Sequence, residues 1–278
     1  MAASALIRER AASWRGSTCG RADNADLDQC LRRASAYASW HPRHGKARSM
    51  SDHSISRWTG VFGLATVAFW LVQFPLYMMG PAPSVYDGGA YADHLRSIHT
   101  IAFTRILLDQ GVYVSMMAFA AGFRHLIRQA SPDCEWLGTL LFGAAAVWLA
   151  VTLVADGLAG GAVLDAISAR PDPSVTRSLI LGTLLIYNSS TAFVMTALFL
   201  GAAGLATLAA RVLPAWTGWL ALIGALLCLA GAPTMFAGAV DYSRIYNVGG
   251  FVPALIANFP PAAWFVVASM LLLRRRAA

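Results

Sequence analysis

Charged residues are scarce in this chain of 278 residues. Asp, Glu, Lys and Arg make up 13% of it and hydrophobic residues 57%, whereas an ordinary soluble domain carries about 25% charged residues. Lys46 is the only lysine among the 21 basic residues. This composition excludes an ordinary water-soluble domain. The use of arginine in place of lysine, together with abundant alanine, is typical of high-GC bacteria.

The chain also lacks the short motifs that identify common enzymes and metal sites. It has no G-x-S-x-G elbow, no phosphate-binding loop, no H-E-x-x-H and no haem attachment motif. Of the 4 cysteines, Cys19 and Cys30 have no zinc-site spacing, and no pair is expected to face an oxidising compartment. We therefore expect no disulfide framework, no metal and no cofactor, and no catalytic residue can be assigned.

Long apolar runs are what the chain has in abundance. A helix rises about 1.5 Å per residue, so roughly 20 apolar residues cross the hydrocarbon core of a bilayer. Lipid cannot hydrogen-bond a bare backbone, and barrel strands would be about half as long. The sequence therefore predicts an all-α, polytopic bundle of six transmembrane helices. The predicted spans are 58–79, 100–123, 136–157, 178–208, 216–237 and 251–273.

The distribution of basic residues predicts the orientation of this bundle. Of the 21 basic residues, 16 fall before the first span, in the loops 124–135 and 209–215, or after the last span. By the positive-inside rule these segments, and both termini, are cytoplasmic. We expect a multi-pass protein of the bacterial plasma membrane, with membrane lipids as partners and no nucleic-acid partner. The oligomeric state is left open.

Residues 1–49 differ from the rest of the chain because they are polar and rich in Ser, Ala and Arg. They lack the apolar core of a secretory signal. Two interpretations are open: a disordered basic tail that contacts anionic lipid, or sequence upstream of the natural start. The second follows from Met50, which opens a run typical of a bacterial start just before the first span.

The clearest functional candidates are Arg105 and Asp109, which lie four residues apart within the second predicted span. Either residue alone in hydrocarbon would cost about 2.5 to 3.5 kcal/mol. At this spacing they share one helix face and can pair, so that face must look into the bundle or into water. Tyr113 continues the same stripe.

Other spans place polar groups at a similar depth, about 8 to 20 Å below the outer end at 1.5 Å per residue. Prolines 75, 233, 260 and 261 mark the same part of the spans, and helix breaks at this depth often line sites. We predict an outward-opening polar pocket in the outer half of the bundle. Its candidate residues are Gln73, Arg105, Asp109, Asp156, Tyr187, Asn188 and Asn258. The alternative is that these side chains only hold helices together.

Three short segments carry a resemblance to a known group of proteins. They are Gly60–Leu64, Phe103–Asp109 and the run from Trp216 to Leu227. On these segments the chain from about 56 to 276 resembles small multi-pass bacterial membrane proteins catalogued as domains of unknown function. The resemblance implies the topology, and it implies no activity and no site residue.

The sequence leaves three functions open. The first is a membrane protein that binds or transports a small molecule through the outer pocket, with Asp109 as proton or cation acceptor and Arg105 as its counter-ion. The second is an intramembrane enzyme acting on a lipid or isoprenoid, with Asp109 or Asp156 as general acid. The third is a membrane scaffold or regulatory partner, which needs no pocket.

Overall fold

The computed structural model describes residues 52–77, 82–248 and 250–274. Within these ranges the chain is helical and forms no strand. The predicted basic tail and the alternative start at Met50 lie outside the described residues. Eight α-helices and two 3-10 helices follow one another along the described chain. They are α3 (Asp52–Tyr77), α4 (Gly88–Ser97), α5 (His99–Ala130), η1 (Pro132–Cys134), α6 (Glu135–Ala166), α7 (Pro173–Tyr187), α8 (Ser190–Ala210), α9 (Ala215–Gly231), η2 (Ala232–Phe236) and α10 (Phe251–Arg274).

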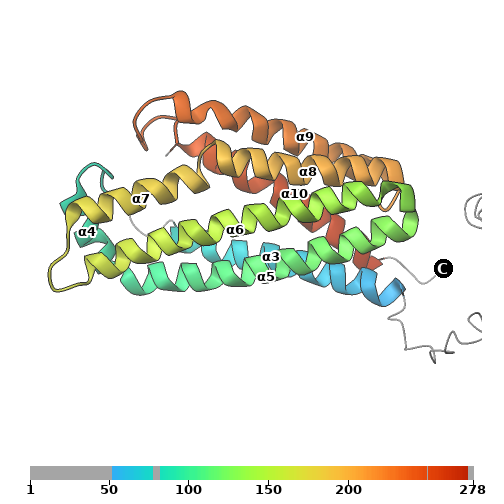
Figure 1. The fold of residues 1–278 in the computed structure, drawn as a ribbon, viewed down its shortest axis with the longest axis horizontal. Coiled ribbons are helices and arrows are strands. Elements are labelled where there is room, and N and C mark those ends of the chain that lie inside the picture. The colour runs from blue at the N-terminus through green and yellow to red at the C-terminus, as the bar shows by residue number, and fades with distance from the viewer. Residues whose placement is uncertain (1–51, 78–81, 249, 275–278) are drawn as a thin grey trace, which may run out of the picture. The chain divides into compact units, whose positions relative to one another are not determined.

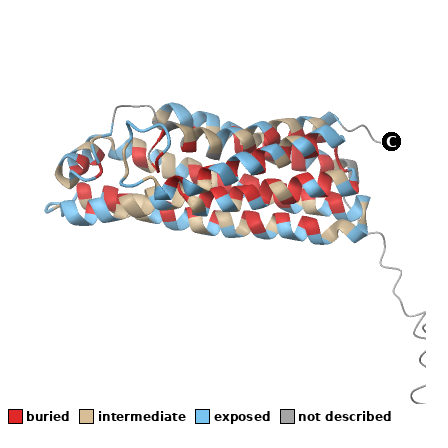
Figure 2. Cartoon of the chain, turned by 90° about the horizontal axis from the view of Figure 1, so that it is seen from above, coloured by how far each residue is buried: buried red, intermediate tan, exposed pale blue. Residues whose placement is uncertain are grey.

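Five stretches of the described residues are long and apolar enough to cross a membrane, which supports a polytopic membrane protein. They are Ser54–Leu76, His99–Ala130, Pro132–Ala166, Pro173–Ala210 and Ala215–Phe236. The outward faces of these helices carry many exposed large apolar side chains, and the buried residues follow the faces that meet (Figure 2). An apolar outer surface of this kind suits contact with lipid.

The helices α5 and α6 are longer than the sequence predicted. Each has 32 residues, or about 48 Å at 1.5 Å per residue. The segment 158–177, predicted to connect the third and fourth spans as a loop, is therefore helical over most of its length, because α6 continues to Ala166 and α7 begins at Pro173. Gly160 and Gly161 lie inside the helix, where Cβ atoms would come within 3.5 Å of Ile106 and 3.4 Å of Leu179. Since such distances are ordinary van der Waals contacts, an alanine would also fit at both positions, and these glycines do not mark a loop.

The predicted span 178–208 is not one continuous helix. It is interrupted between the end of α7 at Tyr187 and the start of α8 at Ser190. The Ser189 hydroxyl donates to the Leu185 carbonyl, and such side-chain bonds compete with helical backbone pairing. Pro75, by contrast, lies within continuous α3.

The bundle is built from neighbouring pairs of helices (Figure 1). Helix α3 packs between α5 and α10, α6 contacts α5, α7 and α8, and α9 contacts α8 and α10. The short helix α4 packs on α6 and α7. We call the end of the bundle that carries α4 the α4 end, and the opposite end, where η1 joins α5 to α6, the η1 end.

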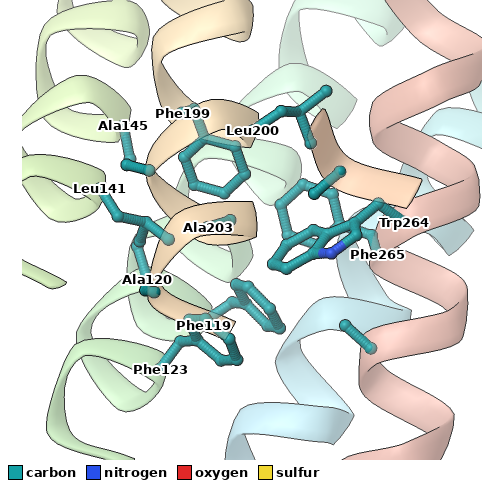
Figure 3. Close-up of a cluster of buried hydrophobic side chains, with 14 of the residues drawn as sticks. Phe119, Ala120, Phe123, Leu141, Ala145, Phe199, Leu200, Ala203, Trp264 and Phe265 are labelled. Atoms are coloured by element: carbon teal, nitrogen blue, oxygen red, sulfur yellow. The ribbon is translucent and has the colours of Figure 1, made fainter. Parts of the chain in front are cut away.

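An aromatic cluster fills the interior toward the η1 end (Figure 3). Trp264 is fully buried, and its ring centre lies 5.7 Å from that of Phe119, 5.6 Å from Phe123 and 5.9 Å from Phe199. Edge-to-face pairs at such distances are each worth about 0.5–1.5 kcal/mol beyond their burial. This cluster makes the η1-side half of the core a tightly packed apolar layer.

Two glycines provide a matched test of this packing. At Gly204 on α8 a Cβ would lie 2.8 Å from the Gly218 carbonyl oxygen of α9, whereas at Gly143 on α6 it would meet nothing within 4 Å. We expect Gly204→Ala to lower the free energy of unfolding by about 1–3 kcal/mol, because backbone must move. Gly143→Ala should leave it unchanged or raise it by up to about 1 kcal/mol. Denaturant titration of the purified variants in detergent measures both free energies of unfolding. An equal change in the two variants would contradict the close contact between α8 and α9.

Candidate functional site

The carboxylate of Asp109 is buried between α3 and α5, where its side chain is 8% exposed. Gln73 of α3, 3% exposed, donates from Nε2 to Asp109 Oδ1 at 2.8 Å. The same amide nitrogen lies 3.1 Å from the Arg105 carbonyl oxygen. Gln73 thus links α3 to the backbone and to the carboxylate of one turn of α5.

A second carboxylate, Asp156 of α6, is 5% exposed and accepts hydrogen bonds from two tyrosines. Tyr113 of α5 donates at 2.7 Å and Tyr187 of α7 at 2.5 Å. The two tyrosine oxygens are themselves 3.0 Å apart, and Gln110 Nε2 lies 3.5 Å from Asp156 Oδ2. Hydrogen bonds to an ionised acceptor are short and strong. Asp156 therefore ties together three helices.

The two carboxylates belong to one site. Asp109 and Asp156 are close enough to interact electrostatically, and the half-buried Arg105 acts on both. We call this set the carboxylate layer, and it comprises Gln73, Arg105, Asp109, Tyr113, Asp156 and Tyr187. Its ionisable charges are two carboxylates and one guanidinium, and its other members are neutral donors.

The structure brings most of the predicted site residues together. Gln73, Asp109, Asp156 and Tyr187 join in the network through the bonds given above. Asn188 follows Tyr187 as the C-cap residue of α7, and its backbone N–H donates to the Leu184 carbonyl.

Two features of the site differ from expectation. Asn258 is exposed on α10 and not among the buried groups. Tyr113 was placed on the stripe of Asp109, but its bond is to Asp156, across to α6. Gln110 was not singled out at all. Its spacing of three residues from Tyr113 puts both on one face of α5, and this is the signal that could have identified it.

Two hollows of the structure bear on the predicted outward-opening pocket. One of about 560 Å³ lies at the α4 end, between Ser84–Tyr86 and Gly238–Arg244. Another lies at the turn between α8 and α9. Neither of these two hollows is lined by a member of the carboxylate layer.

Tyrosines connect the α4-end hollow to the carboxylate layer. Tyr242 in its wall is hydrogen-bonded to Tyr91 of α4, and burial raises the pKa of both hydroxyls. The Tyr86 hydroxyl accepts from the Val240 N–H at 2.9 Å. Arg105 acts electrostatically on Tyr91 as well as on the two carboxylates. Arg105 thus lies within electrostatic range of Tyr91, the partner of the hollow's Tyr242, and of the two buried acids.

Two helix interruptions meet beside this site. The Ser190 hydroxyl at the start of α8 lies 2.9 Å from the Met235 sulfur in η2. At Gly231, where α9 ends, a Cβ would come within 2.8 Å of the Phe193 ring of α8. The α7–α8 interruption and the α9–η2 interruption are therefore in contact. Breaks of this kind at membrane depth are tolerated where protein or a cavity satisfies the freed backbone.

The composition of the layer bears on what it could bind. Among the described residues no group of three or more His, Cys, Asp or Glu is placed to hold a metal ion. Two carboxylates with tyrosine and amide donors suit a proton or a monovalent, hydrogen-bonding cation better than a transition metal.

Comparisons with known proteins give no further guide, since no family model, no curated protein and no solved structure matches this chain. Its resemblance to the multi-pass bacterial membrane proteins stays an expectation, and its function is argued from its residues.

The bond between Tyr187 and Asp156 can be tested against a matched tyrosine. Tyr246 also donates at 2.5 Å, but to the Ala230 carbonyl and from an exposed position. We expect Tyr187→Phe to lower the free energy of unfolding by about 1–3 kcal/mol, because a buried carboxyl group loses a hydrogen-bond partner. Tyr246→Phe should cost about 1 kcal/mol or less. Denaturant titration in detergent measures both, and a larger cost for Tyr246→Phe would contradict the buried network.

Proposed function

We propose that the chain crosses the membrane six times, with α10 as the sixth span and the η1 end in the cytoplasm of a bacterial cell. Helix α10 has 24 residues, its only charge is the terminal Arg274, and it packs on α3 and α9. Exposed tryptophans and arginines gather at the η1 end, as interface anchors and the positive-inside rule lead one to expect. They are Trp58, Trp136, Trp216, Trp219, Arg57, Arg128, Arg211 and Arg274, and the half-buried Arg124 lies at the same end.

Cysteine labelling tests this orientation. Cys134 lies in η1 and is half-buried, whereas Ser243 is exposed in the loop at the α4 end. In a Cys19→Ser, Cys30→Ser background, Cys134 should react with a membrane-impermeant maleimide only after the cells are opened. With Cys134→Ser added, Ser243→Cys should react in intact cells. The reverse pattern would overturn the proposed orientation.

We further propose that the carboxylate layer binds a proton or a small cationic molecule and exchanges it with the aqueous phase at the α4 end. The observation that carries this is the charge of the layer. Asp109 and Asp156 are both buried. Among the described residues only Arg105 acts on both as a counter-charge, and the donors to the two acids are neutral. With both acids ionised, the layer carries one excess negative charge.

An excess charge at this depth requires compensation. Moving an ion out of water costs several kcal/mol even after relaxation, and a proton or bound cation removes that cost. A bundle needs no such site to be stable, since apolar side chains of similar volume pack as well or better. Ionisable residues retained inside a membrane protein therefore favour a functional interpretation.

The arrangement around the layer favours exchange toward the α4 end. On that side lie the hollow and the tyrosines Tyr91 and Tyr242. On the other side, Phe119 begins the aromatic cluster ten residues, or about 15 Å, further along α5. Transport through the protein would require rearrangement, for which the contacting interruptions of α7–α8 and α9–η2 are the natural hinges.

Infrared spectroscopy tests the binding step directly, because a buried carboxyl group absorbs at a different frequency when it is protonated. We expect a pH titration of the purified protein to show a protonated carboxyl band, lost or shifted in Asp109→Asn and in Asp156→Asn. Asp165→Asn serves as control, since Asp165 lies at the α4 end and bonds Thr176 at 2.8 Å. A band that both layer variants leave unchanged would overturn the proposal.

Transport and catalysis are distinguished by two further measurements on the same variants. Flux of protons or of a small ammonium ion into proteoliposomes, abolished by Asp109→Asn, would assign transport. Product formed from a bacterial lipid extract, abolished by the same change, would assign an intramembrane enzyme instead. If the carboxyl groups take up a proton but neither flux nor product formation is detected, the protein binds its ligand without transporting or converting it.

A further inference from the structure

We propose that the hollow at the turn between α8 and α9 binds the phosphate headgroup of an anionic membrane phospholipid through Arg211. The hollow has a volume of about 530 Å³, and its wall includes Arg211, Thr207, Leu208 and Ala215. This site is remote from the carboxylate layer and does not depend on the function proposed there.

Arg211 has a backbone conformation that arginine rarely adopts. Its φ of 53° and ψ of 34° are left-handed, and no other described residue except glycine has a positive φ. Glycine is the usual residue at this position after a helix, because it has no Cβ to clash. A strained residue held where glycine would be favoured directs attention to its side chain.

The polar groups of the wall lack partners within the described part of the chain. The Arg211 side chain is exposed, and no ion pair is formed by it among these residues. Thr207 is fully buried, and its hydroxyl has no hydrogen-bond partner in the described structure. Buried polar groups are normally satisfied. A guanidinium and a hydroxyl in one wall match the oxygens of a phosphodiester.

The depth of the hollow favours a lipid over a soluble anion. Trp216 and Trp219, both exposed, follow it on the first turns of α9, and exposed tryptophans lie at headgroup level. The apolar side chains of Leu208 and Ala215 line the same hollow and suit the start of the acyl chains. Arginine binds phosphate in a bidentate manner and is attracted to anionic lipid surfaces.

The left-handed backbone gives a test in which strain and charge act in opposite directions. Thermal unfolding of the full chain is followed in nonionic detergent, alone and with added phosphatidylglycerol or phosphatidylcholine. Wild type should be stabilised by phosphatidylglycerol and not by phosphatidylcholine. Arg211→Gly should unfold at a higher temperature without lipid, because the backbone strain is relieved. It should nevertheless need about fivefold more phosphatidylglycerol for half of the stabilisation.

Matched variants separate the site from general surface charge. Arg211→Gln should lose the response to phosphatidylglycerol without gaining stability, and Arg211→Lys should retain part of it. Arg57→Gln removes an exposed arginine from the same end and should behave like wild type. An equal phosphatidylglycerol response in Arg211→Gly and wild type would overturn the proposal. So would an equal loss in Arg57→Gln, or full stabilisation by inorganic phosphate alone.

Discussion

The burial of two carboxylates determines how the helices of this bundle meet. Neither Asp109 nor Asp156 can face acyl chains without a large cost, so each must find donors inside the protein. Asp109 takes its donor from Gln73 of α3, and Asp156 takes donors from α5 and α7. Four helices are thereby held in one register. Hydrogen bonds between membrane helices are individually modest, about 0.6 kcal/mol on average, so their value here lies in specifying which faces meet.

The interruption after Tyr187 follows from the same requirement. Tyr187 is the last residue of α7, and its hydroxyl reaches Asp156 as well as the hydroxyl of Tyr113. Ending the helix there frees backbone groups, and Ser189 satisfies one of them by donating to Leu185. The second interruption, at η2, contacts the first through Ser190 and Met235. The irregular backbone of the two interruptions is thus gathered in one place, beside the polar network.

The sequence predicted the membrane class because span length and scarcity of charge depend only on composition along the chain. It also predicted Asp109 and Asp156, since a buried charge is conspicuous in an apolar run. It did not predict their partners: nothing in one sequence states that Tyr113 crosses to α6 or that Asn258 is exposed. The break at Asn188–Ser189 was hidden because no proline or glycine marks it. Of the conspicuous prolines, Pro233 lies in the η2 interruption, whereas Pro75, Pro260 and Pro261 lie in continuous helix. The partners of the two acids, the exposure of Asn258 and the helix break all depend on which helices pack together, and one sequence does not state this.

The two halves of the bundle differ in a way that restricts any motion. Toward the η1 end, Gly204 and Gly218 let α8 and α9 approach closely, and the rings around Trp264 fill the interior. Dense packing of this kind changes in discrete steps and does not deform gradually. Toward the α4 end, α8 and α9 end at the α7–α8 and α9–η2 interruptions, and Tyr242 of the following loop is hydrogen-bonded to Tyr91. If the carboxylate layer exchanges a ligand, the movement must therefore begin on the α4 side. The aromatic half can then remain fixed, as an anchor against which the interrupted helices move.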